Sequence, residues 1–227
     1  MGTEVRVEVP VDARERWQRL LDALALVLEV PAALIMRTTG PHIEVFLSSS
    51  SEGNPYRPGD REVMADSGLY CETVLKTQDK LAVPDALADA RWRDNPDVKL
   101  NMISYLGFPV RWPDDKPFGT ICVLDSKPHR HSVGAETVVS GFRDVIESQL
   151  AMILVNHLLG DKNRRLTDYL MELQALRGVV GICAHCKSIR DTHGAWHPVE
   201  HYLIRHPEAD FSHGVCPKCA AELYPAP

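Results

Sequence analysis

The 227-residue sequence predicts an α+β domain with a central antiparallel sheet flanked by helices, followed by a long helix and a small cysteine-rich tail. Three observations support this fold class. Short apolar runs joined by tight turns indicate antiparallel strands, and amphipathic segments between them indicate helices. Residues 135–176 contain no proline and keep a helical repeat of apolar side chains. Two C-x-x-C pairs then occupy the last quarter of the chain.

The first half of the expected domain begins with an amphipathic helix. Residues 12–29 carry apolar side chains at spacings of three and four, and Pro31 ends the helix. Residues 33–37 and 43–47 are predicted to be two strands of a hairpin, because the turn signal TTGP separates them. Residues 48–60 are polar and rich in Gly, Pro and Ser, which is typical of a loop.

The second half of the expected domain adds a short helix, one more strand and a second hairpin. The sequence PDDKP provides the turn of this hairpin. The expected elements are a helix at 68–77, a strand at 80–83, an irregular segment at 84–96, a helical segment at 98–104, and hairpin strands at 105–112 and 118–125.

The proline-free stretch 135–176 is predicted to form one long amphipathic helix with a coiled-coil seam. Eight of the ten positions in its heptad track are apolar. Gly160 and Asp161 weaken the helix in the middle and leave open a division into two helices. The track consists of Val145, Ser148, Met152, Val155, Leu159, Lys162, Leu166, Tyr169, Leu173 and Leu176.

The first 157 residues contain motifs of a known family. The sequences GLYCETV (68–74), VPDA (83–86), GFPV (107–110) and FGTICVLD (118–125) resemble those of GAF domains in bacterial signalling proteins. The resemblance covers roughly residues 12–157. It implies an antiparallel sheet flanked by helices, a small-molecule pocket on one sheet face, and dimerisation through the terminal helices. We therefore expect a sensor domain at 12–157, a helical linker at 158–177 and a separate tail module at 178–227.

The tail cysteines have the spacing of metal ligands. Cys183 and Cys186 form one pair, and Cys216 and Cys219 form the other. Two such turns supply the four thiolates of a closed tetrahedral site, so we expect one structural Zn²⁺ per chain. A metal-free fold and a pair of disulfides remain alternatives. Replacement of a cysteine by a nearby histidine is a further alternative, with six histidines in this region: His185, His193, His197, His201, His206 and His213.

The tail also resembles a known module. The sequences CAHCKSIRD (183–191) and HGVCPKC (213–219) are similar to a short C-terminal module appended to bacterial receiver, PAS and GAF proteins. A helix or hairpin between the two cysteine pairs is expected at 198–205. The resemblance places the tail in signalling proteins and implies no catalytic mechanism for it.

Five residues are candidates for a ligand site in the GAF-like domain. Tyr70, Cys71 and Tyr105 lie in or beside the family motifs, and Trp92 and Arg93 lie in a segment that offers an aromatic ring and guanidinium groups for an anionic or aromatic ligand. The alternatives are a solvated loop packed by Trp92 and a Cys71 that acts only as a small buried hydrophobe. Cys122 lies in an apolar strand and is interpreted as a core residue.

Composition excludes several classes of function. The formal net charge is −6, and residues 178–227 carry four basic and five acidic side chains, so a nucleic-acid partner is not expected. No run of about 18 apolar residues is present, which argues against a membrane partner. The first residues, MGTE, lack the features of a secretory signal, and paired cysteines fit metal better than disulfides. These features favour a cytoplasmic protein.

The sequence therefore predicts a signalling protein and not an enzyme. No P-loop, H-E-x-x-H or G-x-S-x-G motif occurs, and no catalytic residues are assigned. We expect a homodimeric sensor in which a small molecule bound to the GAF-like domain acts through paired helices on the zinc-held tail, with an unidentified downstream signalling protein. One alternative is a GAF-type methionine sulfoxide reductase that uses Cys71. Another is a transcription regulator that binds DNA through the zinc module.

Overall fold

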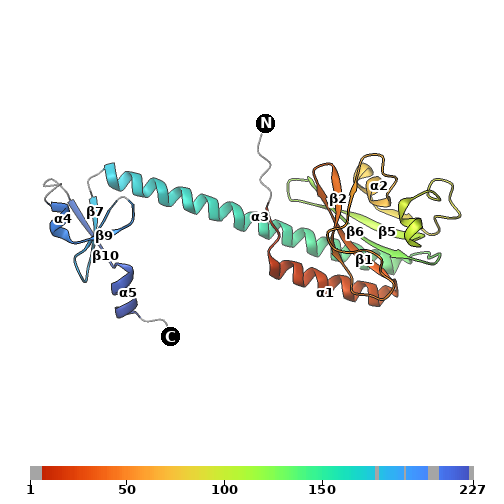
Figure 1. Ribbon diagram of the computed structural model, residues 1–227, viewed down its shortest axis with the longest axis horizontal. Helices are drawn as coiled ribbons and strands as arrows, with labels where there is room; N and C mark the ends of the chain where they lie inside the picture. Colours follow the sequence, from red (N-terminus) through yellow and green to blue (C-terminus); the bar gives the residue numbers. More distant parts are fainter. Residues whose placement is uncertain (1–6, 177–178, 192, 204–209, 225–227) are drawn as a thin grey trace. The chain divides into compact units, whose positions relative to one another are not determined.

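The computed structural model describes residues 7–176, 179–191, 193–203 and 210–224, and it divides into two compact units, Met1–His157 and Leu158–Pro227. Figure 1 labels the elements. Those that begin in the first unit are α1 (Val11–Leu28), β1 (Ala32–Thr39), β2 (His42–Ser48), β3 (Arg61–Val63), α2 (Tyr70–Thr77), β4 (Leu81–Val83), η1 (Pro96–Leu100), β5 (Ser104–Arg111), β6 (Pro117–Asp125) and α3 (Val133–Leu176).

Six strands of the first unit form one antiparallel sheet in the order β3-β2-β1-β6-β5-β4. Both expected hairpins are confirmed, β1 with β2 and β5 with β6. The two hairpins meet where β1 pairs with β6, with Leu34 opposite Cys122. Strand β3 lies inside neither expected hairpin, and it pairs with β2 at the edge of the sheet.

Two apolar cores form, one on each face of the sheet. The first contains residues of α1 and α3, such as Trp17, Leu21, Ile146 and Leu150, and the indole nitrogen of Trp17 donates to the side chain of Gln149 at 2.6 Å. The second core lies on the face covered by α2 and the segments beside it. Figure 1 shows α1 and the first part of α3 on one side of the sheet and α2 on the other. The antiparallel sheet with flanking helices confirms the predicted α+β fold.

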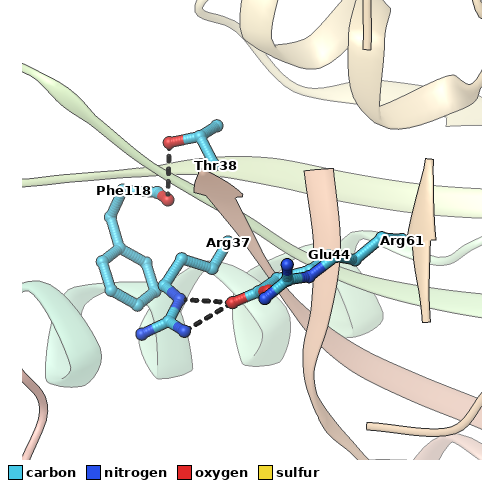
Figure 2. A network of polar contacts seen from close by, with 5 residues as sticks. All are labelled: Arg37, Thr38, Glu44, Arg61 and Phe118. Atoms are coloured by element: carbon cyan, nitrogen blue, oxygen red, sulfur yellow. Dashed lines mark hydrogen bonds and ion pairs between the residues drawn. The ribbon is translucent and has the colours of Figure 1, made fainter. Parts of the chain in front are cut away.

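A buried carboxylate joins the three strands at one edge of the sheet (Figure 2). Glu44 on β2 is almost fully buried, and it accepts hydrogen bonds from Arg37 on β1 and from Nε of Arg61 on β3 at 2.8 Å. The guanidinium of Arg37 also lies 4.4 Å from the ring centre of Phe46. Burial acts to raise the pKa of Glu44, but the two arginines outweigh it and lower the pKa. The three residues of edge strand β3 are all exposed, so the strand buries no apolar side chain. The charge-assisted bond from Arg61 to Glu44 therefore holds it against β2.

The segment before β5 differs from the expectation. A helical segment was predicted at 98–104, whereas a short 3-10 helix, η1, begins earlier and ends at Leu100. The side chain of Asn95 caps its start by accepting from the backbone N–H of Asp97 at 2.8 Å. Asn101 adopts a left-handed conformation with φ of 62°, which ends the helix.

Helix α3 is one continuous element of 44 residues, so the division considered at Gly160 does not occur. One glycine costs only about 1 kcal/mol in a helix interior, which the flanking residues outweigh. One face of α3 joins the first core through Val139, Ile146 and Leu150. The described apolar side chains of the heptad track lie outside this core and are exposed: Val145, Met152, Val155, Leu159, Leu166 and Tyr169. Leu173 and Leu176 have side chains outside the described residues.

The tail contains a second, smaller sheet. Its strands lie in the order β10-β7-β8-β9, and β10 runs parallel to β7. The expected helix at 198–205 corresponds to α4, and Arg205 lies outside the described residues. None of the described helices of the chain combines the length and apolar composition needed to cross a membrane. The tail elements are β7 (Val179–Cys183), β8 (Ile189–Arg190), β9 (Trp196–His197), α4 (Val199–Leu203), β10 (Asp210–Gly214) and α5 (Pro217–Leu223).

Candidate metal centre and ligand face

The four tail cysteines meet at one point. One sulfur from each of Cys183, Cys186, Cys216 and Cys219 lies within 4.8 Å of every other. Three of the residues are buried and Cys186 is exposed, and Trp196 packs against the group. Among the described residues no histidine belongs to this cluster. His206, one of the alternative ligands, lies outside the described residues.

Local backbone structure brings the two cysteine pairs together. Cys183 ends β7, and the parallel pairing of β7 with β10 places it opposite Gly214, two residues before Cys216. The turn after Cys183 closes through Lys187, whose φ of 62° is left-handed and whose N–H donates to the Cys183 carbonyl at 2.9 Å. Cys216 is the N-cap of α5, and the proline that follows it starts the helix. The turn at the end of β7 and the start of α5, which are far apart in the sequence, thus each bring two sulfurs to the site.

The surroundings of the sulfurs favour negative charge on one of them. Burial acts to raise the pKa of Cys183, but backbone N–H groups of Cys216, Cys186 and His185 lower it to about 5. The N–H of Cys216 donates to the Cys183 sulfur at 3.3 Å. Burial, followed by the neighbouring cysteines, raises the pKa of Cys219 to about 12. Four thiols this close resist joint ionisation unless a cation neutralises them, so the arrangement suits a bound metal ion.

The second candidate site is the sheet face beneath α2. The rings of Tyr70 and Tyr105 stack with centres 4.7 Å apart, and Trp92 lies tilted 5.2 Å from Tyr70. Cys71 packs beside them. The structure therefore brings four of the five sequence candidates together, while the fifth, Arg93, is exposed.

Gly107 makes room for the Tyr105 side chain on this face. A β-carbon at position 107 would lie 2.1 Å from the Tyr105 hydroxyl oxygen, far inside contact distance. The hydroxyl instead reaches the sulfur of Cys71 at 3.4 Å. The glycine of the GFPV motif therefore sets the position of a buried aromatic ring.

Sequence reasoning missed a buried carboxyl at the same face. Asp97 is buried at the start of η1 and accepts a hydrogen bond from the Tyr56 hydroxyl at 2.7 Å. Burial raises the pKa of Asp97 to about 6, although the bond from Tyr56 acts in the opposite direction. No sequence signal marks this residue, because Asp97 lies between the irregular segment 84–96 and the expected helical segment 98–104, where an aspartate is typical of the solvated surface.

Asp97→Asn is expected to stabilise the protein at neutral pH. The raised pKa means that the neutral carboxyl stabilises the fold fully below about pH 4 and that this contribution is lost as pH rises through about 6. The amide stays neutral and still accepts from Tyr56, so the gain at pH 7.5 should be about 1–2 kcal/mol and should vanish near pH 4. Denaturant unfolding at both pH values measures this difference in the free energy of unfolding. Asp94→Asn, at an exposed position, is the control and should leave the free energy of unfolding unchanged at both pH values.

Glu72 of the GLYCETV motif organises the loop before α2. Its carboxylate accepts from the backbone N–H of Asp66 at 2.7 Å and of Gly68 at 2.9 Å, and from the Ser67 hydroxyl at 3.1 Å. Lys76 lies 2.7 Å from it, one turn along α2. Burial acts to raise the pKa of Glu72, but these donors together lower it to about 2. The motif glutamate therefore has a structural role beneath the ligand face.

Glu72→Gln should weaken the fold at neutral pH and reduce its sensitivity to acid. A lowered pKa stabilises the folded state above the ordinary value of 4.5, and this stability is lost as pH falls toward 2. The contribution at pH 7 should be about 2–3 kcal/mol. Unfolding free energies between pH 7 and pH 3 should fall less steeply in Glu72→Gln than in wild type, whereas exposed Glu62→Gln should follow wild type. Parallel curves for the three proteins would contradict this role.

The sheet with helices on both faces and a buried aromatic cluster defines an α+β domain with a candidate ligand face. The family model of the GAF domain matches residues 12–150, more than half of the chain. The chain therefore belongs to the GAF domain family, as its motifs predicted. No curated protein matches the chain by sequence.

Solved structures show the same fold at low sequence identity. The blue-light absorbing form of the PixJ GAF domain of Thermosynechococcus elongatus is 16% identical, with a TM-score of 0.55, over 70% of this chain and 98% of that one. The phycoerythrobilin-bound GAF domain of a cyanobacterial phytochrome is 12% identical, with a TM-score of 0.56, over 65% and 89%. Type II free methionine-R-sulfoxide reductase of Thermoplasma acidophilum is 14% identical, with a TM-score of 0.50, over 63% and 94%.

Proposed function

We propose that this chain is a non-enzymatic signalling protein, in which a GAF domain senses a small molecule and acts through a dimeric helix on a zinc-held tail. The observation that carries the proposal is the exposed apolar face of α3. This helix packs on the GAF core with one side and continues to the tail with another side uncovered.

The occupant we propose for that face is the α3 helix of a second copy. The exposed residues Met152, Val155, Leu159 and Leu166 follow each other at spacings of three, four and seven, which is the spacing of knobs-into-holes packing. Burial of a leucine side chain in such a seam contributes about 1.5–3 kcal/mol. A ligand that favours one packing of the paired helices would shift the population of dimer states, which is the coupling the proposal requires.

The metal we propose for the tail is zinc. Four cysteine sulfurs are the donor set of closed structural zinc sites. Two sulfurs that each lie about 2.3 Å from a tetrahedral zinc ion are about 3.8 Å apart, and the sulfurs of Cys186 and Cys216 are 3.8 Å apart. Among its described residues the module buries few apolar side chains, so metal binding would supply much of its stability.

The sensing role rests on the sheet face under α2. Relatives with the same fold hold bilins, as the phycoerythrobilin-bound domain does. In this chain the Tyr70 hydroxyl is buried without a hydrogen-bond partner among the described residues. A buried polar group without a partner costs about 1–3 kcal/mol, and a small polar ligand that reaches Tyr70 would recover it.

Leu159→Glu should convert the proposed dimer to a monomer. Each copy loses an apolar contact in the seam and gains a charge that a packed seam cannot solvate, so the dimer dissociation constant should rise about 100-fold or more. The control is Arg164→Glu, which places the same side chain about 200° around the helix from Leu166. Sedimentation velocity at equal micromolar concentrations distinguishes them, and identical profiles for wild type and both variants would contradict an α3 seam.

A second candidate function is a thiol-dependent reductase that uses Cys71 on free methionine sulfoxide. Cys122 belongs to the same buried core cluster as Cys71, and it is the neighbour that acts most strongly to lower the Cys71 pKa. We propose it as the resolving partner that such an enzyme needs. Turnover of free methionine sulfoxide by wild type and by Cys71→Ser decides this function. Absence of turnover, or equal turnover in both proteins, would exclude it.

A further inference from the structure

Two cysteines inside the GAF domain remain without a role in the signalling proposal. Cys71 lies on α2 and Cys122 lies at the centre of β6, so they are 51 positions apart in the sequence and belong to different layers. Both belong to the core beneath α2 and are buried free thiols. The alternation of β6 explains their meeting, because Thr120, Cys122 and Leu124 point to the same face of the sheet.

Cys122 and the polar groups around Cys71 lower the pKa of its thiol, although burial acts to raise it. The Thr120 hydroxyl donates to the Cys71 sulfur at 3.3 Å, and the Tyr105 hydroxyl lies 3.4 Å from it. Cys122 follows Thr120 by two residues in β6 and belongs to the same buried cluster as Cys71. A sulfur that accepts a hydrogen bond from one hydroxyl, lies beside a second hydroxyl and shares its buried cluster with another thiol has the surroundings of a reactive thiol and its resolving partner.

We propose that Cys71 and Cys122 are a redox pair, which a hydroperoxide oxidises to an intrachain disulfide between α2 and β6. The Cys71 thiolate attacks the outer peroxide oxygen and the O–O bond breaks. The leaving oxygen takes a proton and departs as an alcohol, or as water from hydrogen peroxide. Cys71 becomes a sulfenic acid, and the Cys122 sulfur then attacks it and releases water. Overall, two thiols and one hydroperoxide give one disulfide, one alcohol and one water.

The disulfide changes the ligand face. Once the two sulfurs are joined, neither carries a thiol proton, and Cys71 can no longer be the thiolate that the Thr120 and Tyr105 hydroxyls stabilise. Tyr105 is also the ring that stacks on Tyr70. The oxidation state of the pair would therefore act directly on the aromatic cluster, and a dithiol reductant would reverse it by thiol–disulfide exchange.

The test is peptide mapping of the folded full-length protein after exposure to hydrogen peroxide. We expect a linked pair of tryptic peptides, one with Cys71 and one with Cys122, and its loss after treatment with dithiothreitol. In Cys122→Ser we expect Cys71 to accumulate as a sulfenic acid that dimedone traps. The proposal is overturned if Cys71 stays reduced while the tail cysteines oxidise, or if it links to a tail cysteine instead.

A second variant tests the surroundings of Cys71 without removing a thiol. Thr120→Val keeps the side-chain shape and removes one donor to the sulfur, so oxidation should slow by about fivefold, the factor that one ordinary hydrogen bond is worth. Thr137→Val, at an exposed position one turn after the start of α3, is the matched control and should oxidise at the wild-type rate. Equal rates for all three proteins would contradict an activated Cys71. This test requires neither a dimer nor turnover of methionine sulfoxide, so its outcome is independent of both proposed functions.

Discussion

Replacing Cys183 and Cys216 together with serine is expected to remove the metal and unfold the tail, while the GAF domain stays folded. The double variant keeps one sulfur in each pair, and two ligands cannot close a tetrahedral site. Structural zinc sites contribute about 10–16 kcal/mol of apparent binding free energy at neutral pH, far more than a module of this size gains from its core. Elemental analysis and amide hydrogen exchange across residues 179–224 measure the two effects.

A matched control separates the thiolates from the nearby imidazoles. His185 lies between the two cysteines of the first pair and is exposed. His185→Ala should therefore retain about one zinc per chain and the exchange protection of the tail. Zinc retained in the cysteine double variant, or lost in His185→Ala, would refute the four-cysteine assignment.

Gly119→Ala is expected to disrupt the centre of the GAF sheet. A β-carbon at position 119 would lie 1.8 Å from the carbonyl oxygen of Met36 and 2.9 Å from the α-carbon of Arg37, both in the backbone of β1. Backbone atoms of a paired strand cannot rotate away as a side chain does. The two hairpins would have to separate where β1 meets β6, at a cost of about 3 kcal/mol or more.

The same substitution elsewhere in the chain should have the opposite effect. A β-carbon at Gly141 meets nothing within 4 Å, and the residue lies inside α3. Gly141→Ala should therefore stabilise the protein by up to about 1 kcal/mol. Thermal unfolding of the GAF unit compares the two variants, and equal melting temperatures would contradict the close approach of β1 and β6.

The hairpins and long helices were predictable because their signals are local. Turn residues lie between apolar runs in both hairpins, and the heptad track of α3 needs only the sequence around it. Strand β3 carries no such signal. Its three residues, 61–63, are exposed and show no alternation of apolar and polar side chains. The carboxylate of Glu44 on the neighbouring strand β2 holds the strand by accepting a hydrogen bond from Arg61. Short, polar edge strands depend on tertiary contacts.

The candidate sites show the same division. The four-cysteine cluster was predictable from spacing alone, because one short turn brings the two sulfurs of each pair together. The hydrogen bond between Thr120 and Cys71 and the hydrogen bond between Tyr56 and Asp97 join residues at least 41 positions apart. Such meetings depend on which face of the sheet each strand presents and on where α2 packs. Arg93 was proposed for its place beside Trp92, and the structure shows only that its side chain is exposed, so its ligand contact stays a prediction.

The measurement that tests the signalling proposal most directly is the molar mass of the metal-loaded wild-type protein by light scattering over a series of micromolar concentrations. The chain has a mass of 25.4 kDa. Pairing through the apolar face of α3 predicts twice that mass, with dissociation only on dilution. A mass of one chain at every concentration would contradict the paired helix, and with it the route from the GAF domain to the tail.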